Sequence, residues 1–244
     1  MACASFAVAV VLWQAVVWVF DLPHFILPGP AKVAAALVDN TSLLASHAST
    51  TLLEVLIGLL LGGSLGALTA LGLAYSKGAR ELFKPMLAFT QALPVFALAP
   101  ILTLWLGYGL WSKVAMAVLI IFFPVMSAFL DGLLRTPAGW LDLATTMGAR
   151  ERAILFRLRV PNALPSLGAG IKLAAVYAPI GAVIGEWVGS SSGLGYLMLL
   201  ASGRAKVDLM FAAMLVLGVM SVTLYLLVGW LTDKAVARYA DRTG

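Results

Sequence analysis

Long stretches without a charged residue are the strongest constraint in this 244-residue sequence. An α-helix needs roughly 20 mostly apolar residues to cross a bilayer. Five charge-free runs have about that length: 4–20, 55–76, 85–112, 114–130 and 209–232. A further run from Pro165 to Glu186 is interrupted only by Lys172, whose long side chain can reach the headgroups. The sequence therefore predicts an all-α polytopic membrane protein of about six transmembrane helices.

The composition supports a membrane protein with a single transmembrane domain over residues 1–244. Hydrophobic residues make up 62% of the chain and charged residues 11%, whereas a soluble domain carries roughly 25% charged residues. The one cysteine, Cys3, excludes an internal disulfide and a cysteine-based zinc or iron–sulfur site within one copy.

Basic residues gather on one side of the predicted spans. The eleven on that side are Lys77, Arg80, Lys84, Arg135, Arg150, Arg152, Arg157, Arg159, Lys234, Arg238 and Arg242. Lys32, Lys113, Arg204 and Lys206 are expected on the other side. Because cytoplasmic loops are enriched in lysine and arginine, this bias places both termini in the cytoplasm. The net charge of +5 then reflects orientation in a lipid bilayer, and no nucleic-acid partner is expected.

The most specific pattern lies between the fourth and fifth spans, in residues 138–161. Asp142 is followed by Leu143 and Ala144, then by Gly148; after nine intervening residues come Leu158, Val160 and Pro161. We expect a helix opened by Pro137, a left-handed turn at Gly148, and a second short helix from Arg150 to about Arg159 that Pro161 ends. Such a hairpin, with Arg150 and Arg152 on it, fits a groove on another protein. The alternative is an amphipathic linker on anionic headgroups.

This spacing resembles the EAA motif of the permease subunits of ATP-binding-cassette (ABC) importers, with Asp142 replacing the usual glutamate and Leu143 the first alanine. The segments 93–100, 105–109 and 122–124 are similar to the nitrate, taurine and sulfonate branch of these permeases. The segments 177–189 and 193–198 are similar to permeases for thiamine pyrimidine precursors, hydroxymethylpyrimidine or formylaminopyrimidine.

The resemblance implies a type I ABC importer permease fold in the bacterial inner membrane. It also implies two cytoplasmic ATPase subunits and an extracytoplasmic substrate-binding protein. We expect a second permease copy in a homodimer, because one bundle of this size is too small to enclose a complete pathway and the chain contains no second homologous half. The residues expected to couple to the ATPase are Asp142, Leu143, Ala144, Gly148, Arg150, Arg152, Leu158, Val160 and Pro161.

No chemistry is expected in the chain itself. It lacks the G-x-x-x-x-G-K-[ST] loop that cradles phosphates, so ATP and magnesium belong to the partner ATPase. His24 and His47 stand in unrelated segments without the spacing of a metal site. We therefore predict a transport subunit that is not an enzyme and holds no cofactor or metal.

Prolines and polar residues within the spans indicate a substrate pathway, because proline frees backbone carbonyls that a water-filled cavity can satisfy. The candidates are Gln91, Pro94, Phe96, Tyr177 and Pro179. Alternatively, the prolines only kink helices for packing. Glu186 and Trp187 are candidates for an outer gate or a contact with the binding protein, against a plain structural hydrogen bond for Glu186.

Three alternatives stay open. The substrate could instead be taurine or another alkylsulfonate, nitrate, or a riboflavin-like compound. The chain could instead be a carrier driven by an ion gradient, which requires intramembrane ionisable residues. The candidates are Glu54, Lys172 and Glu186, but all three are expected near the ends of spans. Glu54 is expected to be an interfacial anchor. The glycines at 58, 62 and 66 predict close helix packing within the chain or, alternatively, a dimer contact.

Overall fold

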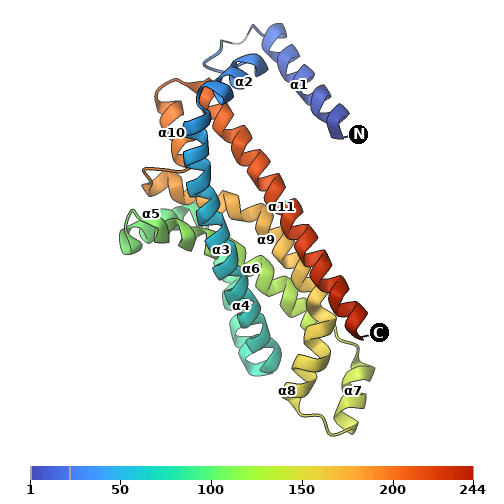
Figure 1. Cartoon of the computed structure of the whole chain (residues 1–244). Helices are drawn as coiled ribbons and strands as arrows, with labels where there is room; N and C mark the ends of the chain where they lie inside the picture. The colour runs from blue at the N-terminus through green and yellow to red at the C-terminus, as the bar shows by residue number, and fades with distance from the viewer. Residues whose placement is uncertain (1, 22, 244) are drawn as a thin grey trace.

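The computed structural model describes residues 2–21 and 23–243, and every regular element in those ranges is a helix (Figure 1). In chain order these are α1 (Ala2–Val19), α2 (Pro30–Asp39), α3 (Thr41–Tyr75), α4 (Lys77–Ala92), α5 (Val95–Leu106), α6 (Leu110–Leu134), α7 (Ala138–Thr146), α8 (Glu151–Ile154), the π-helical turn η1 (Leu155–Arg159), α9 (Val160–Gly189), α10 (Leu194–Gly203) and α11 (Val207–Thr243). The predicted all-α fold is confirmed. The side chains of Cys3, Lys84, Arg238 and Arg242 lie outside the described residues.

Four helical segments are long and apolar enough to cross a membrane: α3, α6, the continuous helix 151–189, and α11. A fifth is added if α4 and α5 form one bent span. The predicted first span corresponds to α1, whose described apolar part, Ala7–Val19, is shorter than a full span. The count of about six spans therefore stays a prediction.

The third predicted span, 85–112, is wrong as a single helix. α4 ends at Ala92, α5 begins at Val95, and the two axes meet at 96°. Leu93 has extended backbone angles, as expected for a residue before proline, because the proline ring disfavours helical geometry there. Pro94 caps the start of α5, so it separates two helices where a mid-span kink was expected.

The chain from residue 30 to residue 75 forms two helices, α2 and α3. α2 ends at Asp39, and Asn40 bonds through its side chain to the carbonyl of Ala36. α3 then begins at Thr41 and runs for 35 residues, about 52 Å at 1.5 Å per residue. That length exceeds the hydrocarbon core of roughly 30 Å, so part of α3 extends beyond the apolar layer.

Close packing of α3 and α9 against α6 forms the centre of the fold. The glycines Gly58, Gly62 and Gly66 all face α6 and are buried. A Cβ at Gly58 would lie 2.5 Å from the Cβ of Ala117, and one at Gly66 would lie 2.7 Å from the carbonyl oxygen of Phe122. The packing interpretation of this series is confirmed, and its use as a dimer contact is wrong, because α6 already fills that face.

Candidate functional site

A helical hairpin projects from one end of the molecule and contains all the predicted coupling residues. This hairpin, residues 138–161, comprises α7, a turn, α8, η1 and the first residues of α9, and it lies at the end opposite α2 and α10 (Figure 1). Gly148 has φ +76°, the left-handed conformation that favours glycine. Its N–H donates to the carbonyl of Thr145 (2.9 Å). The predicted helix end and left-handed turn at Gly148 are confirmed.

The second half of the hairpin differs from the prediction. Pro161 does not end a short helix; it lies in the first turn of α9, which continues to Gly189. In η1 the backbone forms π-type bonds, including one from the N–H of Val160 to the carbonyl of Leu155. This wider turn directly before Pro161 separates the proline ring from the carbonyls of the preceding turn, where a regular helix would produce a clash.

The outer face of α7 is apolar and exposed. No residue of α7 is buried, and Trp140, Leu143 and Met147 are 54%, 62% and 78% exposed. Their spacings of three and four residues place them on one helix face. Asp142 is exposed beside them, and Ala144 is half-buried. A grouped apolar surface of this kind indicates a binding site for a partner.

The remaining predicted coupling residues lie on the second half of the hairpin. Arg150 and Arg152 are exposed, and the Arg152 guanidinium carbon lies 6.0 Å from the centroid of the Phe156 ring. Leu158, Val160 and Pro161 are half-buried behind the tip, in η1 and the first turn of α9. The structure thus brings the motif together in one hairpin, while its role in coupling stays a prediction.

The five predicted pathway residues do not line one enclosed space within a single copy. Gln91, Pro94 and Phe96 are exposed around the α4–α5 bend, with Phe96 67% exposed. On α9, Tyr177 is exposed and Pro179 is buried in the core. Four of the five therefore lie on the outside of the copy.

A buried carboxylate holds the start of α10 in place. Glu186, near the end of α9, is only 1% exposed. Its Oε2 accepts hydrogen bonds from the backbone N–H groups of Gly195 (2.5 Å) and Tyr196 (3.4 Å), and its Oε1 accepts one from Thr51 Oγ1 (2.6 Å). These amides belong to the first turn of α10, where helical N–H groups have no partner within the helix.

Side chains of α3 complete this N-terminal cap. Thr51 Oγ1 accepts from the N–H of Leu194 (2.8 Å), and His47 Nδ1 accepts from the N–H of Gly193 (3.0 Å). Gly193 has φ +106° and passes so close to Glu186 that an added Cβ would overlap the carboxylate. Four consecutive amides are thus bonded by side chains from α3 and α9.

A buried ammonium group accompanies the carboxyls. Lys113, at the start of α6, is 2% exposed and donates to the carbonyl oxygens of Tyr108 (2.5 Å), Gly109 (2.9 Å) and Gly189 (2.6 Å). Glu54, also 2% exposed, lies near Glu186 and Lys113. We call Thr51, Glu54, Lys113 and Glu186 the buried polar cluster; it joins α3, α6, α9 and α10.

The buried polar cluster corrects three expectations. Lys113, counted among the basic residues outside the spans, and Glu54, expected as an interfacial anchor, are both enclosed by α3, α6 and α9. Glu186 is also enclosed, so its carboxylate makes the structural hydrogen bonds of the alternative interpretation, and no contact with a binding protein reaches it in this conformation. Trp187 beside it is half exposed. A gating role for Glu186 and Trp187 stays a prediction.

Sequence reasoning missed the capping roles of His47 and Thr51. The available signal was the spacing of His47, Thr51 and Glu54, four and three residues apart, which places three polar side chains on one face of an apolar helix. A second signal was the Gly193-Leu194-Gly195 turn shortly after Glu186.

Known proteins are similar to this chain in sequence and in fold. A family model described as "Binding-protein-dependent transport system inner membrane component" matches residues 55–240. A "Probable ABC transporter permease protein" of Haemophilus influenzae is 48% identical over 229 residues, covering 94% of each chain. The "Formylaminopyrimidine transport permease protein ThiX" of Halalkalibacterium halodurans is 40% identical over 192 residues, covering 78% of this chain and 76% of that protein. A structure titled as inward-facing conformations of the MetNI methionine ABC transporter matches with a TM-score of 0.59 and 19% identity, over 78% of this chain and 91% of that one; this likeness shows the fold alone.

Proposed function

Because the chain belongs to the family of binding-protein-dependent transport system inner membrane components and is the permease subunit of an ABC importer, we propose that it carries a thiamine pyrimidine precursor. The relative that is 40% identical is named as a permease for formylaminopyrimidine, and this supports a substituted aminopyrimidine as the solute. As a member of this family the chain is a transport subunit and not an enzyme. Its task is to bind partners and change conformation.

One observation carries the proposed mechanism: the exposed apolar face of α7. In the proposal, a cytoplasmic ATPase subunit docks on Trp140, Leu143 and Met147, with Arg150 and Arg152 beside the contact. The hairpin is continuous with α9 through η1, so its displacement on ATP binding moves a helix of the central packing. ATP binding then favours an outward-open pathway and hydrolysis an inward-open one, because each nucleotide state stabilises the conformation that it binds better.

We also propose that the pathway forms between two copies of the chain. Apolar side chains at 173, 176, 177, 180 and 187 remain exposed along one face of α9, and Tyr177 is among them. Phe96 on α5 is exposed as well. A second copy facing these surfaces encloses residues that one copy leaves on its outside.

The proposed orientation places the hairpin in the cytoplasm. The start of α4, the hairpin and the end of α11 lie toward the same end of the molecule (Figure 1), and these segments contain the predicted cytoplasmic basic residues. The C-terminus is then cytoplasmic, and α2 and α10 face the binding protein.

Reconstitution tests the ATP-driven mechanism. We expect the chain to take up hydroxymethylpyrimidine into liposomes only with its ATPase, its binding protein and ATP. Leu143→Asp, which puts a charge into the proposed docking face, should abolish ATPase co-purification and uptake. Ser202→Asp, exposed at the end of α10, should retain the ATPase. Uptake by the chain alone, driven by a proton or sodium gradient, would contradict the importer mechanism.

The substrate is tested separately through the partner binding protein. We expect mass spectrometry of that protein to find a substituted pyrimidine. An alkylsulfonate, nitrate or riboflavin as the retained ligand would refute the pyrimidine assignment and leave the importer mechanism in place.

A further inference from the structure

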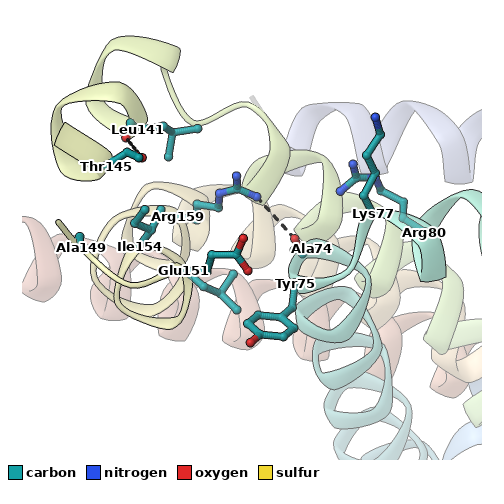
Figure 2. A pocket seen from close by; sticks show the side chains of 11 residues that line it. Ala74, Tyr75, Lys77, Arg80, Leu141, Thr145, Ala149, Glu151, Ile154 and Arg159 are labelled. Atoms are coloured by element: carbon teal, nitrogen blue, oxygen red, sulfur yellow. Dashed lines mark hydrogen bonds between the residues drawn. The ribbon is translucent and has the colours of Figure 1, made fainter.

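A cavity of about 420 Å³ separates the hairpin from the corner where α3 ends and α4 begins (Figure 2). We call residues 74–80 the corner. The corner contributes Tyr75, Lys77 and Arg80 to the lining, and the hairpin contributes Thr145, Glu151 and Arg159 together with apolar side chains. The cavity therefore lies between the proposed force-receiving segment and the end of a membrane-spanning helix.

Positive charge predominates in this cavity. The charged residues of the lining are the bases Lys77, Arg80 and Arg159 and a single acid, Glu151. In the part of the chain that the structure describes, Glu151 forms no ion pair within 4.0 Å with any of them. Lys77 pairs only with Glu81, at 3.9 Å and on the exposed surface, and such pairs contribute little. Among the described residues, the guanidinium groups of Arg80 and Arg159 in this lining thus have no ion-pair partner.

The two guanidinium groups have unused donors. A guanidinium carries five N–H groups in a planar fork. Arg159 Nη1 donates to the carbonyl of Ala74 at 3.5 Å, and Arg80 Nη1 donates to the carbonyl of Leu73 at the same distance, the long limit of a hydrogen bond. The Nε of Arg159 is buried and has no partner. A buried donor without an acceptor is unfavourable, and the oxygens of an anion bound in the cavity would supply acceptors for these donors.

We propose that this cavity binds a phosphoryl group between Arg159 of the hairpin and Arg80 and Lys77 of the corner. The planar fork of arginine matches the oxygens of a phosphate in two parallel hydrogen bonds. The corner includes the last residues of α3, where a membrane-spanning helix reaches the headgroups, and basic pockets at that depth bind anionic lipid headgroups. A phospholipid headgroup and a soluble phosphate share this chemistry.

A bound phosphoryl group would connect the hairpin to the corner and restrain their relative movement. This consequence rests on the proposed function, since it matters only if the hairpin moves during transport. The binding itself rests on the cavity alone and is measured without ATPase or transport.

The experiment uses the purified full chain in detergent. Native mass spectrometry compares retention of phosphatidylglycerol with that of phosphatidylcholine, and thermal unfolding is followed with inorganic phosphate against chloride at equal ionic strength. Arg159→Gln should weaken binding about tenfold or more, because one charge-assisted bidentate contact is lost. Arg80→Gln, which removes a half-buried side chain, should weaken binding in the same direction and serves where the Arg159 variant does not fold.

Glu151→Gln distinguishes a binding site from a structural arginine. Removing the one acid of the cavity should strengthen anion binding about two- to fivefold, whereas a merely structural role predicts no gain. The double variant Arg204→Gln with Lys206→Gln, exposed between α10 and α11, is the matched control and should bind as the unmodified chain does.

The source of the phosphoryl group follows from which probe binds. Selective retention of phosphatidylglycerol assigns a lipid headgroup, and stabilisation by inorganic phosphate assigns a soluble compound. The proposal is overturned if neither probe binds, if the two arginine variants bind as well as the unmodified chain, or if Glu151→Gln weakens binding.

Discussion

Replacing Gly193 by alanine tests the buried polar cluster where the backbone approaches it most closely. Gly193 combines φ +106° with ψ 161°, a region that is essentially confined to glycine. An added Cβ would also overlap the Glu186 carboxylate. The substitution therefore disturbs both the backbone and the acceptor that caps α10.

The expected loss follows from these two effects. Holding alanine in this backbone region costs about 1–3 kcal/mol. Displacing the carboxylate weakens the bond that it accepts from the N–H of Gly195 (2.5 Å), and a hydrogen bond to a charged group contributes about 1.5–3 kcal/mol. Because part of the backbone strain and part of the overlap with Glu186 can be relieved by small local shifts, we expect the free energy of unfolding to fall by about 2–5 kcal/mol.

The assay is equilibrium unfolding in mixed micelles, with Gly203→Ala as the control. Gly203 ends the same helix and has open space around it, so that variant should remain within about 0.5 kcal/mol of the unmodified chain or be slightly more stable. A double-mutant cycle with Glu186→Ala isolates the overlap, since that variant has no carboxylate to displace. The double variant should lose less stability than the sum of the single ones. Unchanged stability of Gly193→Ala, or strictly additive losses, would refute the proposed contact.

Three further substitutions test the packing, the cluster and the hairpin. Gly66→Ala should lower the free energy of unfolding by about 1–3 kcal/mol, because its Cβ would lie 2.7 Å from a carbonyl oxygen of α6. The control Gly63→Ala, which faces open space, should leave the free energy of unfolding unchanged. Equal effects of the two substitutions would contradict the packing of α3 against α6. Lys113→Met should cost about 3–5 kcal/mol, because it leaves three carbonyls and buried carboxyls without their ammonium; a normal melting temperature would count against the cluster. Gly148→Ala strains a turn at φ +76° by about 1–2 kcal/mol, and it should reduce ATPase co-purification and uptake without altering the circular dichroism of the bundle. The control Gly139→Ala, at the start of α7 with open space around it, should retain both activities. Equal losses in the two variants would contradict the role of the turn.

Features encoded in short stretches of sequence were predictable. The charge-free runs located α6, α11 and the apolar parts of α3 and α9, because the bilayer selects long apolar helices. Gly148 located the turn of the hairpin, since a left-handed residue has a strong local preference for glycine.

Features that depend on tertiary contacts were not predictable. Glu54, Lys113 and Glu186 lie far apart in the sequence, so each was interpreted by itself as a charge near a membrane edge. Their burial becomes favourable only when α3, α6 and α9 pack and supply partners to one another. Pro94 was a visible signal, yet a proline alone does not distinguish a modest kink from the 96° bend that the structure shows.

The π-helical turn η1 determines the direction, around the α9 axis, in which the apolar face of α7 points. A regular α-helix advances by about 100° per residue, and a π-turn accommodates one additional residue within an otherwise α-helical path. Straightening Leu155–Arg159 into a regular α-helix of the same length would rotate α8 and α7 by about 100° around the α9 axis, whereas deleting one residue would leave their direction nearly unchanged. The direction in which the apolar face of α7 points is therefore set by the π-type hydrogen bonding of this turn.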